Sequence, residues 1–256
     1  MTTWFRSASG LFLPVNILRK QTRNKKTYRE VANSIPSLIE LFKLHSVEIP
    51  TTSGIYKLME NTCILADLYD KRDFSKMTKK MLWSGVAYMK VYDLLWAIKD
   101  NSAIKKYLSK SIHGGLDCGT DIPSQAKDSL WEVEVFVKLD NAGLSPMFEE
   151  PDMSFQLDKK KTGIACKKIY SKKNTINTIN KAIRQIASST HYGIIAINLD
   201  KLAEAYWGEV KAVDKNMALD VLTAYNRKFA KEHEAQLVKL FKDKNLIAAL
   251  FSSSTL

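Results

Sequence analysis

The stretch from Glu149 to Ile186 contains an acid and an amine whose spacing suits phosphodiester chemistry. Asp152 precedes an apolar run typical of a strand, and Lys167 lies in the next such run, beyond a lysine-rich turn. Because side chains alternate along a strand, Lys167 can face Asp152 across a sheet, on the same face as Ala165. A carboxylate and an amine placed together in this way can hold a divalent cation and a water beside a phosphodiester.

The composition favours a folded protein with a polyanionic partner. The 256 residues are 45% hydrophobic, which is enough for a core in one large or two small domains. The formal net charge of +12 favours nucleic acid or an anionic membrane surface, and a solvated lysine-rich surface is the alternative. Three widely spaced cysteines indicate a reduced, cytoplasmic compartment, and we expect no membrane segment because no apolar stretch is long enough to span one.

The first part of the chain shows helical periodicity. Apolar residues recur at helical spacing over 35–44, 55–68, 77–98 and 102–112. The segment 113–124 contains three glycines and a proline, which indicate a linker or loop. We therefore predict a helical domain at 1–115, a linker at 116–124 and a second domain at 125–256.

The second domain is predicted to mix helices and strands. A helix over 124–142 is followed by strands over 145–148, 152–157 and 163–169, a helix over 174–188 and a buried strand over 193–199. A long polar helix over 216–243 and a strand over 246–251 complete the prediction. The fold class is α/β (α+β), with an N-terminal helical domain followed by an αβββαβ core around a mixed central sheet.

This order of elements, with the short motifs inside it, resembles the PD-(D/E)XK nuclease superfamily, which has the restriction-endonuclease-like fold. The resemblance covers about residues 129–199. The residues that carry it are Trp131-Glu132, Asn141-Ala142-Gly143, Pro151-Asp152, Ile164-Ala165-Cys166-Lys167-Lys168, Ser171 and Ala182-Ile183-Arg184-Gln185-Ile186. The resemblance implies a metal-dependent endonuclease that binds DNA and hydrolyses phosphodiester bonds, in a bacterial or phage defence setting.

The resemblance also implies roles for individual residues. Asp152 and Glu132 would bind Mg²⁺ or Mn²⁺. Because Mg²⁺ takes oxygen ligands, the backbone carbonyl of Cys166 could complete a minimal set with them. Lys167 would polarise the scissile phosphate or position the attacking water, and Gln185 would face the site from the following helix. Taken alone, each residue has a structural alternative, because Pro-Asp pairs often begin turns and lysines often protect edge strands.

The chain departs from the family pattern at Ala165, where the family has its second acid. Three explanations stay open. The site has lost catalysis while keeping DNA binding, the alanine was introduced deliberately, or another carboxylate compensates. The candidates for a compensating carboxylate are Glu134, Glu149, Glu150 and Asp158.

Lysines flank the predicted site and are expected to contact phosphates without sequence preference. They are Lys159, Lys160 and Lys161 in the turn, and Lys168, Lys172 and Lys173 after the second strand. A further basic cluster precedes the first clear helix and consists of Arg19, Lys20, Arg23, Lys25, Lys26 and Arg29. These clusters favour nucleic acid as the partner, and the resemblance implies that it is DNA.

Two other functions remain as alternatives. The first is a catalytically inactive nuclease-fold protein that acts as a nucleic-acid-binding or scaffold subunit. The second is an interaction protein without a nucleic-acid role, whose basic charge serves solubility. The N-terminal helical domain is expected to bind DNA, to dock a partner subunit or to form a homo-oligomer.

Overall fold

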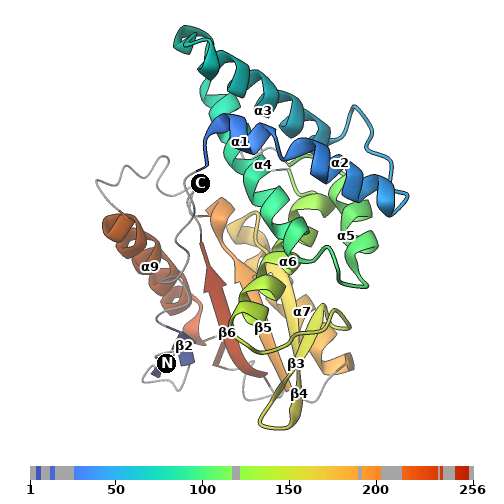
Figure 1. Ribbon diagram of the computed structural model, residues 1–256. Coiled ribbons are helices and arrows are strands. Elements are labelled where there is room, and N and C mark those ends of the chain that lie inside the picture. Colours follow the sequence, from blue (N-terminus) through green and yellow to red (C-terminus); the bar gives the residue numbers. More distant parts are fainter. Residues whose placement is uncertain are drawn as a thin grey trace. The chain divides into compact units, whose positions relative to one another are not determined.

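The computed structural model describes most of the chain in two compact units (Figure 1). The described residues are 4–6, 12–14, 26–116, 122–189, 192–202, 215–235, 237–238 and 246–253. Residues 22–137 form one unit, here called the helical unit, and residues 138–255 with 1–21 form the other, here called the sheet unit. The predicted α/β class, with a helical N-terminal region followed by a mixed sheet, is confirmed.

The helical unit consists of helices that bury one apolar face each. Their bounds are Tyr28–Ala32 (α1), Ile35–Leu44 (α2), Gly54–Asp70 (α3), Lys79–Ala97 (α4), Ile104–Ser111 (α5) and Gln125–Asn141 (α6), with a short 3-10 helix, η1, at Phe74–Lys76. Hydroxyl side chains cap several of them by accepting a backbone N–H from the first turn. These caps are Thr27 on α1, Ser53 on α3 and Thr78 on α4.

The helical periodicity located most of these helices. The ranges 35–44, 55–68, 77–98 and 102–112 correspond to α2, α3, α4 and α5, and 124–142 corresponds to α6. The helix α1 has no counterpart in the prediction, because its five residues are too few to show a period. Among the described helices, none is both long and apolar enough to cross a membrane.

The sheet unit contains a four-stranded mixed sheet in the order β3-β4-β5-β6. Its elements are Met153–Leu157 (β3), Lys160–Lys168 (β4), the 3-10 helix Lys172–Asn174 (η2), Thr175–Ser189 (α7), Tyr192–Asn198 (β5), Lys215–Glu232 (α9) and Leu246–Ser252 (β6). The pair β3–β4 is antiparallel, whereas β4–β5 and β5–β6 are parallel. A separate antiparallel pair joins Trp4–Arg6 (β1) to Phe12–Pro14 (β2).

Two predicted elements differ from the structure. The strand predicted over 145–148 is only an isolated antiparallel bridge between Met147 and Ser154. Ser145 has a left-handed φ of 45° and Pro146 has no N–H to donate, so the ladder cannot extend on that side. The helix predicted over 216–243 is α9 as far as Glu232. After a turn at His233, residues 234–235 and 237–238 are again helical, and residues 236 and 239–245 lie outside the described part.

The division between the units also lies elsewhere than the sequence suggests. It falls inside α6, after Val137, whereas the sequence predicts domains at 1–115 and 125–256. Side chains on α6 form ion pairs with earlier helices, as Glu134 does with Lys90 at 2.8 Å, which ties most of α6 to the helical unit. Of the predicted linker at 116–124, residues 117–121 lie outside the described part.

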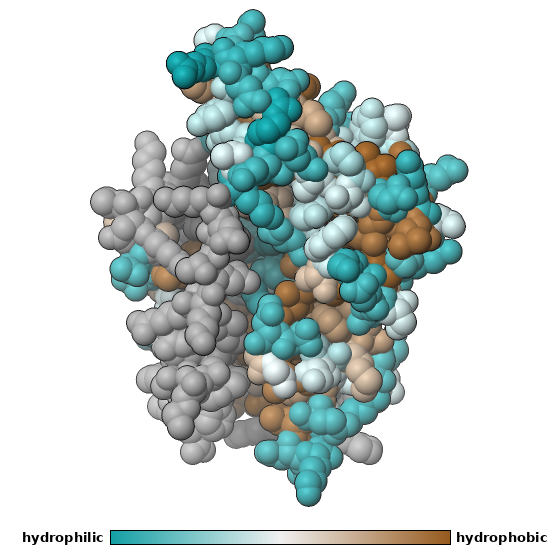
Figure 2. All heavy atoms as spheres, in the orientation of Figure 1, coloured by the Kyte–Doolittle hydropathy of each residue, from teal (hydrophilic) through white to brown (hydrophobic). Residues whose placement is uncertain are grey.

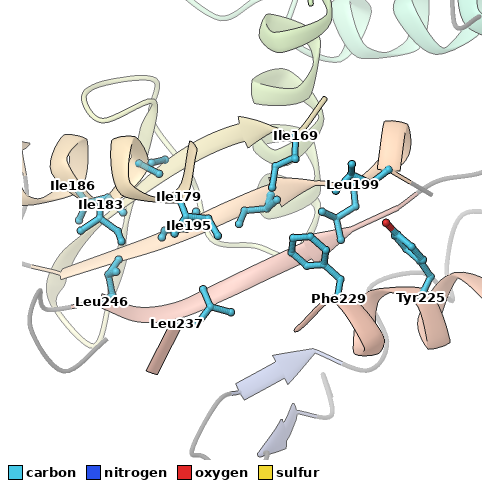
Figure 3. Close-up of a cluster of buried hydrophobic side chains, with 14 residues drawn as sticks. Ile169, Ile179, Ile183, Ile186, Ile195, Leu199, Tyr225, Phe229, Leu237 and Leu246 are labelled. Atoms are coloured by element: carbon cyan, nitrogen blue, oxygen red, sulfur yellow. The ribbon is translucent and has the colours of Figure 1, made fainter. Parts of the chain in front are cut away.

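The core of the sheet unit lies between the sheet and the helices packed on it (Figure 3). Ile179, Ile183 and Ile186 of α7 point toward the sheet and join the buried cluster that contains Ile195 of β5. The helix approaches closely because Gly193 has no side chain. A Cβ atom at this glycine would lie 2.1 Å from Cγ2 of Ile186.

Replacing Gly193 by alanine is expected to lower the free energy of unfolding by about 1–3 kcal/mol, because the branched side chain of Ile186 must move. Urea denaturation followed by circular dichroism measures this loss. The matched control is Gly143→Ala, where a Cβ meets no atom within 4 Å and the cost comes from a left-handed φ of 79°. Equal stability of the wild type and the Gly193→Ala variant would contradict the close packing of α7.

Candidate active site

The candidate site is centred on Asp152, which directly precedes β3. Its carboxylate is 14% exposed and accepts three hydrogen bonds. Oδ2 accepts from the backbone N–H of Cys166 at 2.7 Å and from Nζ of Lys167 at 3.2 Å. Oδ1 accepts from Nε2 of Gln185 at 3.1 Å. The structure therefore brings together four of the predicted site residues, which are Asp152, Cys166, Lys167 and Gln185.

The hairpin of β3 and β4 places the acid beside the amine. The two strands pair in a register that sets Met153 opposite Ile164 and Leu157 opposite Lys160. They are joined by Asp158 and Lys159, whose φ values of 50° and 64° are those of a two-residue type I′ turn. Continuing the register one residue beyond Met153 brings Asp152 level with Ala165, on the face that also carries Lys167.

Lys167 is held in place by two acceptors. Besides the carboxylate, its Nζ donates to the backbone carbonyl of Cys166 at 3.0 Å, and its side chain is 24% exposed. A partly buried ion pair of this kind interacts more strongly than a surface pair because water screens it less. The ammonium therefore lies in a fixed position next to the acid.

Gln185 reaches the site from α7, which packs on β4 and β5. Its amide nitrogen also donates to the backbone carbonyl of Pro151. One side chain thus holds both the acid and the residue that precedes it. Neighbouring positions of α7, Ile183 and Ile186, are buried in the core, so the packing of the helix fixes where Gln185 lies.

Ala165 stands on β4 where the resemblance requires a second acid. The residue is fully buried and belongs to the same apolar cluster as Ile179 and Ile183. No carboxylate oxygen is present at this position, and a methyl group fills the space beneath α7. The described site therefore has one carboxylate, that of Asp152, next to one ammonium.

Glu132 has its described partners in the helical unit. Its Oε2 accepts from Oη of Tyr107 at 2.9 Å and from Nζ of Lys110 at 3.4 Å. It also lines a cleft of about 410 Å³ within that unit. The other residues that line this cleft are Lys110, Pro123, Ser124, Gln125, Asp128 and Ser129.

The carboxylates considered as replacements for the missing acid have other surroundings. Glu134 pairs with Lys90, and Asp158 lies exposed in the hairpin turn. Glu149 accepts from Nζ of Lys161 at 2.8 Å and from Oγ of Ser154. Lys161 and then Ser154 lower the pKa of Glu149, so it carries its charge in the folded protein at neutral pH. Glu150 is exposed beside Pro151.

The predicted phosphate-binding lysines lie mainly on exposed segments. The hairpin turn contains Lys159, and β4 begins with Lys160 and Lys161. Nζ of Lys160 lies over the ring of Tyr192, 4.8 Å from its centroid. Lys172 and Lys173 are exposed on η2, while Lys168 at the end of β4 is partly buried. Of the basic cluster before the first helix, Lys26 and Arg29 are described and the remaining residues lie outside the described part.

Two backbone groups of the site could not be read from side-chain types. The N–H of Cys166 donates the shortest hydrogen bond to Asp152, and the carbonyl of Pro151 accepts from Gln185. Strand alternation places the Cys166 side chain on the face opposite to Lys167, but it does not predict the partner of the Cys166 N–H.

The oxygen atoms near Lys167 give a minimal set for a hard cation. Mg²⁺ keeps several waters and is usually held by one or two carboxylates together with substrate phosphates. Asp152 supplies one carboxylate, the smaller number in that range, and the carbonyl of Cys166 supplies one further oxygen. Within the described residues, no group of three or more His, Cys, Asp or Glu side chains could hold a metal ion.

Comparisons with known proteins give no further assignment for this site. No family model, no curated protein and no solved structure matches the chain.

Proposed function

We propose that this chain is a metal-dependent phosphodiester hydrolase of the PD-(D/E)XK type that binds DNA. The observation that carries the proposal is the convergence of Asp152, Lys167 and Gln185 on one face of the hairpin and α7. A strand acid beside a lysine from the next strand, braced from a following helix, is the arrangement expected of such an enzyme. The lysine-rich tip of the same hairpin supports a polyanionic substrate.

In this proposal each side chain has a defined task. Asp152 and the Cys166 carbonyl would hold Mg²⁺ or Mn²⁺, which supplies an activated water and neutralises charge on the phosphate when bound. Lys167 presents an ammonium to a phosphate that approaches the carboxylate, because its Nζ is only 3.2 Å from Oδ2. The amide of Gln185 donates a hydrogen bond to Oδ1 of Asp152 and so fixes the plane of the carboxylate.

A second candidate is a nucleic-acid-binding or scaffold protein in which the same site no longer cleaves. The observation that favours it is the buried methyl group of Ala165 at the position of the second acid. A site with one carboxylate offers a cation fewer charged ligands, and its Asp152 is already satisfied by three donors. We place either function in the cytoplasm, where the free thiols of Cys63 and Cys166 stay reduced.

A cleavage assay separates the two candidates. Plasmid and linear DNA are incubated with the full chain in Mg²⁺ or Mn²⁺, beside Asp152→Ala and Ala165→Glu variants. The hydrolase predicts cleavage by the wild type that Asp152→Ala abolishes. The inactive site predicts no cleavage by the wild type, with retention of DNA at low salt and cleavage gained in Ala165→Glu.

The matched control is Glu149→Gln. This residue lies near Asp152 in sequence, yet its contacts are with Lys161 and Ser154. Its neutral variant should cleave as the wild type does. Neither cleavage nor DNA retention in any variant would overturn both candidates and leave an interaction protein without a nucleic-acid role.

A further inference from the structure

The turn between α3 and α4 exposes aromatic rings in an otherwise charged surface, here called the α3–α4 tip and defined as Tyr69–Lys80. Tyr69 is 45% exposed and Phe74 is 57% exposed. Their rings meet edge to face at 5.8 Å, and Tyr28 of α1 meets Tyr69 in the same way at 5.1 Å. More than half of the Phe74 surface therefore remains open to a ligand.

Basic residues surround these rings. The tip contains five cations and two carboxylates, for a formal net charge of +3, and Figure 2 shows a hydrophilic surface where α3 meets α4. The cations are Lys71, Arg72, Lys76, Lys79 and Lys80. Both carboxylates are held in ion pairs, Asp70 with Arg29 and Asp73 with Lys76, each at 2.8 Å. The acids are thus neutralised locally, and the tip has an excess of positive charge.

Arg72 occupies a position where glycine would be more stable. α3 ends in a Schellman motif, in which the N–H of Asp73 donates to the carbonyl of Leu68 and that of Arg72 to the carbonyl of Tyr69. Arg72 has a φ of 57°, the left-handed conformation that this motif requires. Glycine adopts it without steric cost, whereas arginine does not. The side chain of Arg72 is exposed at the surface of the tip, where it can meet an anion.

We propose that the α3–α4 tip binds single-stranded nucleic acid, with a base stacked on Phe74 and phosphates bound by Arg72 and its basic neighbours. Exposed aromatic rings among cations are the combination that such strands require, since every base has a face to stack and every nucleotide has a phosphate. Duplex DNA keeps its bases stacked inside and would use the cations alone. The tip belongs to the helical unit, so the inference does not rest on the site around Asp152.

An anionic membrane is the competing occupant, because aromatic and basic residues also gather at membrane surfaces. The observations favour nucleic acid. A membrane-binding helix presents a broad apolar face, whereas the tip from 69 to 80 exposes Tyr69 and Phe74 between charged side chains. The rings also pack against each other, which gives a stacking platform rather than an apolar surface that inserts into lipid.

Fluorescence anisotropy with a labelled oligothymidine of about 12 nucleotides, a length within the usual site sizes, tests the proposal. The full chain is used with chelator present, so that no cleavage intervenes. Phe74→Ala should weaken binding about tenfold, the effect of removing one stacked base. Leu44→Ala, which removes another exposed apolar side chain of the helical unit, should leave binding unchanged.

The Arg72→Gly variant separates function from folding. It should weaken oligonucleotide binding while raising the melting temperature by about 2–4 °C, because glycine relieves the left-handed strain. Equal affinity of Phe74→Ala and wild type, or unchanged affinity in Arg72→Gly, would overturn the proposal. So would a loss of binding to phosphatidylserine vesicles in these variants without a loss of oligonucleotide binding.

Discussion

An Asp152→Ala variant is expected to lose about 3 kcal/mol of unfolding free energy, without any metal or DNA present. The reason is the set of donors that converge on this carboxylate, the N–H of Cys166, the ammonium of Lys167 and the amide of Gln185. Removing the carboxylate takes this acceptor away from the partly buried ammonium of Lys167 and from two N–H donors. Urea denaturation followed by far-ultraviolet circular dichroism measures the loss.

Two companion variants show whether the loss comes from unpaired donors. Lys167→Met removes the cation together with its need for a partner, so it should cost about 1 kcal/mol. Lys161→Met breaks the more exposed pair with Glu149 and should cost less than about 1 kcal/mol. If Asp152→Ala were no more harmful than Lys161→Met, the three-donor network would be energetically unimportant.

The Ala165→Glu variant is expected to be less stable than the wild type by about 3 kcal/mol in chelator and to recover stability in Mg²⁺. The position is fully buried, so a longer side chain overpacks the cluster under α7. The new carboxylate also lies level with Asp152, and two anions repel each other. A divalent cation between them removes that repulsion. At a hundred times its Kd, the cation adds about 2.7 kcal/mol.

Thermal melting with chelator, Mg²⁺ or Ca²⁺ measures this recovery, and Ala165→Gln is the matched control. Glutamine has nearly the same volume and therefore the same overpacking, but no charge. Mg²⁺ should stabilise the glutamate variant and leave the glutamine variant unchanged. The same shift in both variants would mean that the cation binds elsewhere, and the assignment of Ala165 to the metal position would be wrong.

Much of the fold could be predicted because its elements are long and periodic. The stripe in α3 and the continuous apolar run of β5 each carry a repeated signal that a single residue cannot obscure. The strand expected over 145–148 is reduced to one bridge, because Pro146 has no N–H to donate and Ser145 has a left-handed φ. Short elements such as α1 gave no periodicity to detect.

The site could be predicted where strand alternation decides the geometry, and Gln185 was predicted from the resemblance alone. The parity of Asp152, Ala165 and Lys167 follows from the pleat and places all three on one face. The role of Glu132 depends on how a helix is oriented toward its neighbours, which local pattern does not determine. Its bonds to Tyr107 and Lys110 come from residues more than twenty positions earlier in the chain.

The place of β6 in the sheet has a consequence for how a nascent chain folds. β5 is buried from Gly193 to Asn198, and one of its two edges pairs with β6, whose residues 246–252 are synthesised about fifty positions later. Until β6 emerges from the ribosome, the N–H and C=O groups along that edge of β5 are unpaired and can pair with strands of other chains. The helices of residues 26–116 depend on contacts nearer in sequence and can form earlier. Translation that stops before β6 should therefore yield aggregation through β5 rather than a smaller stable protein.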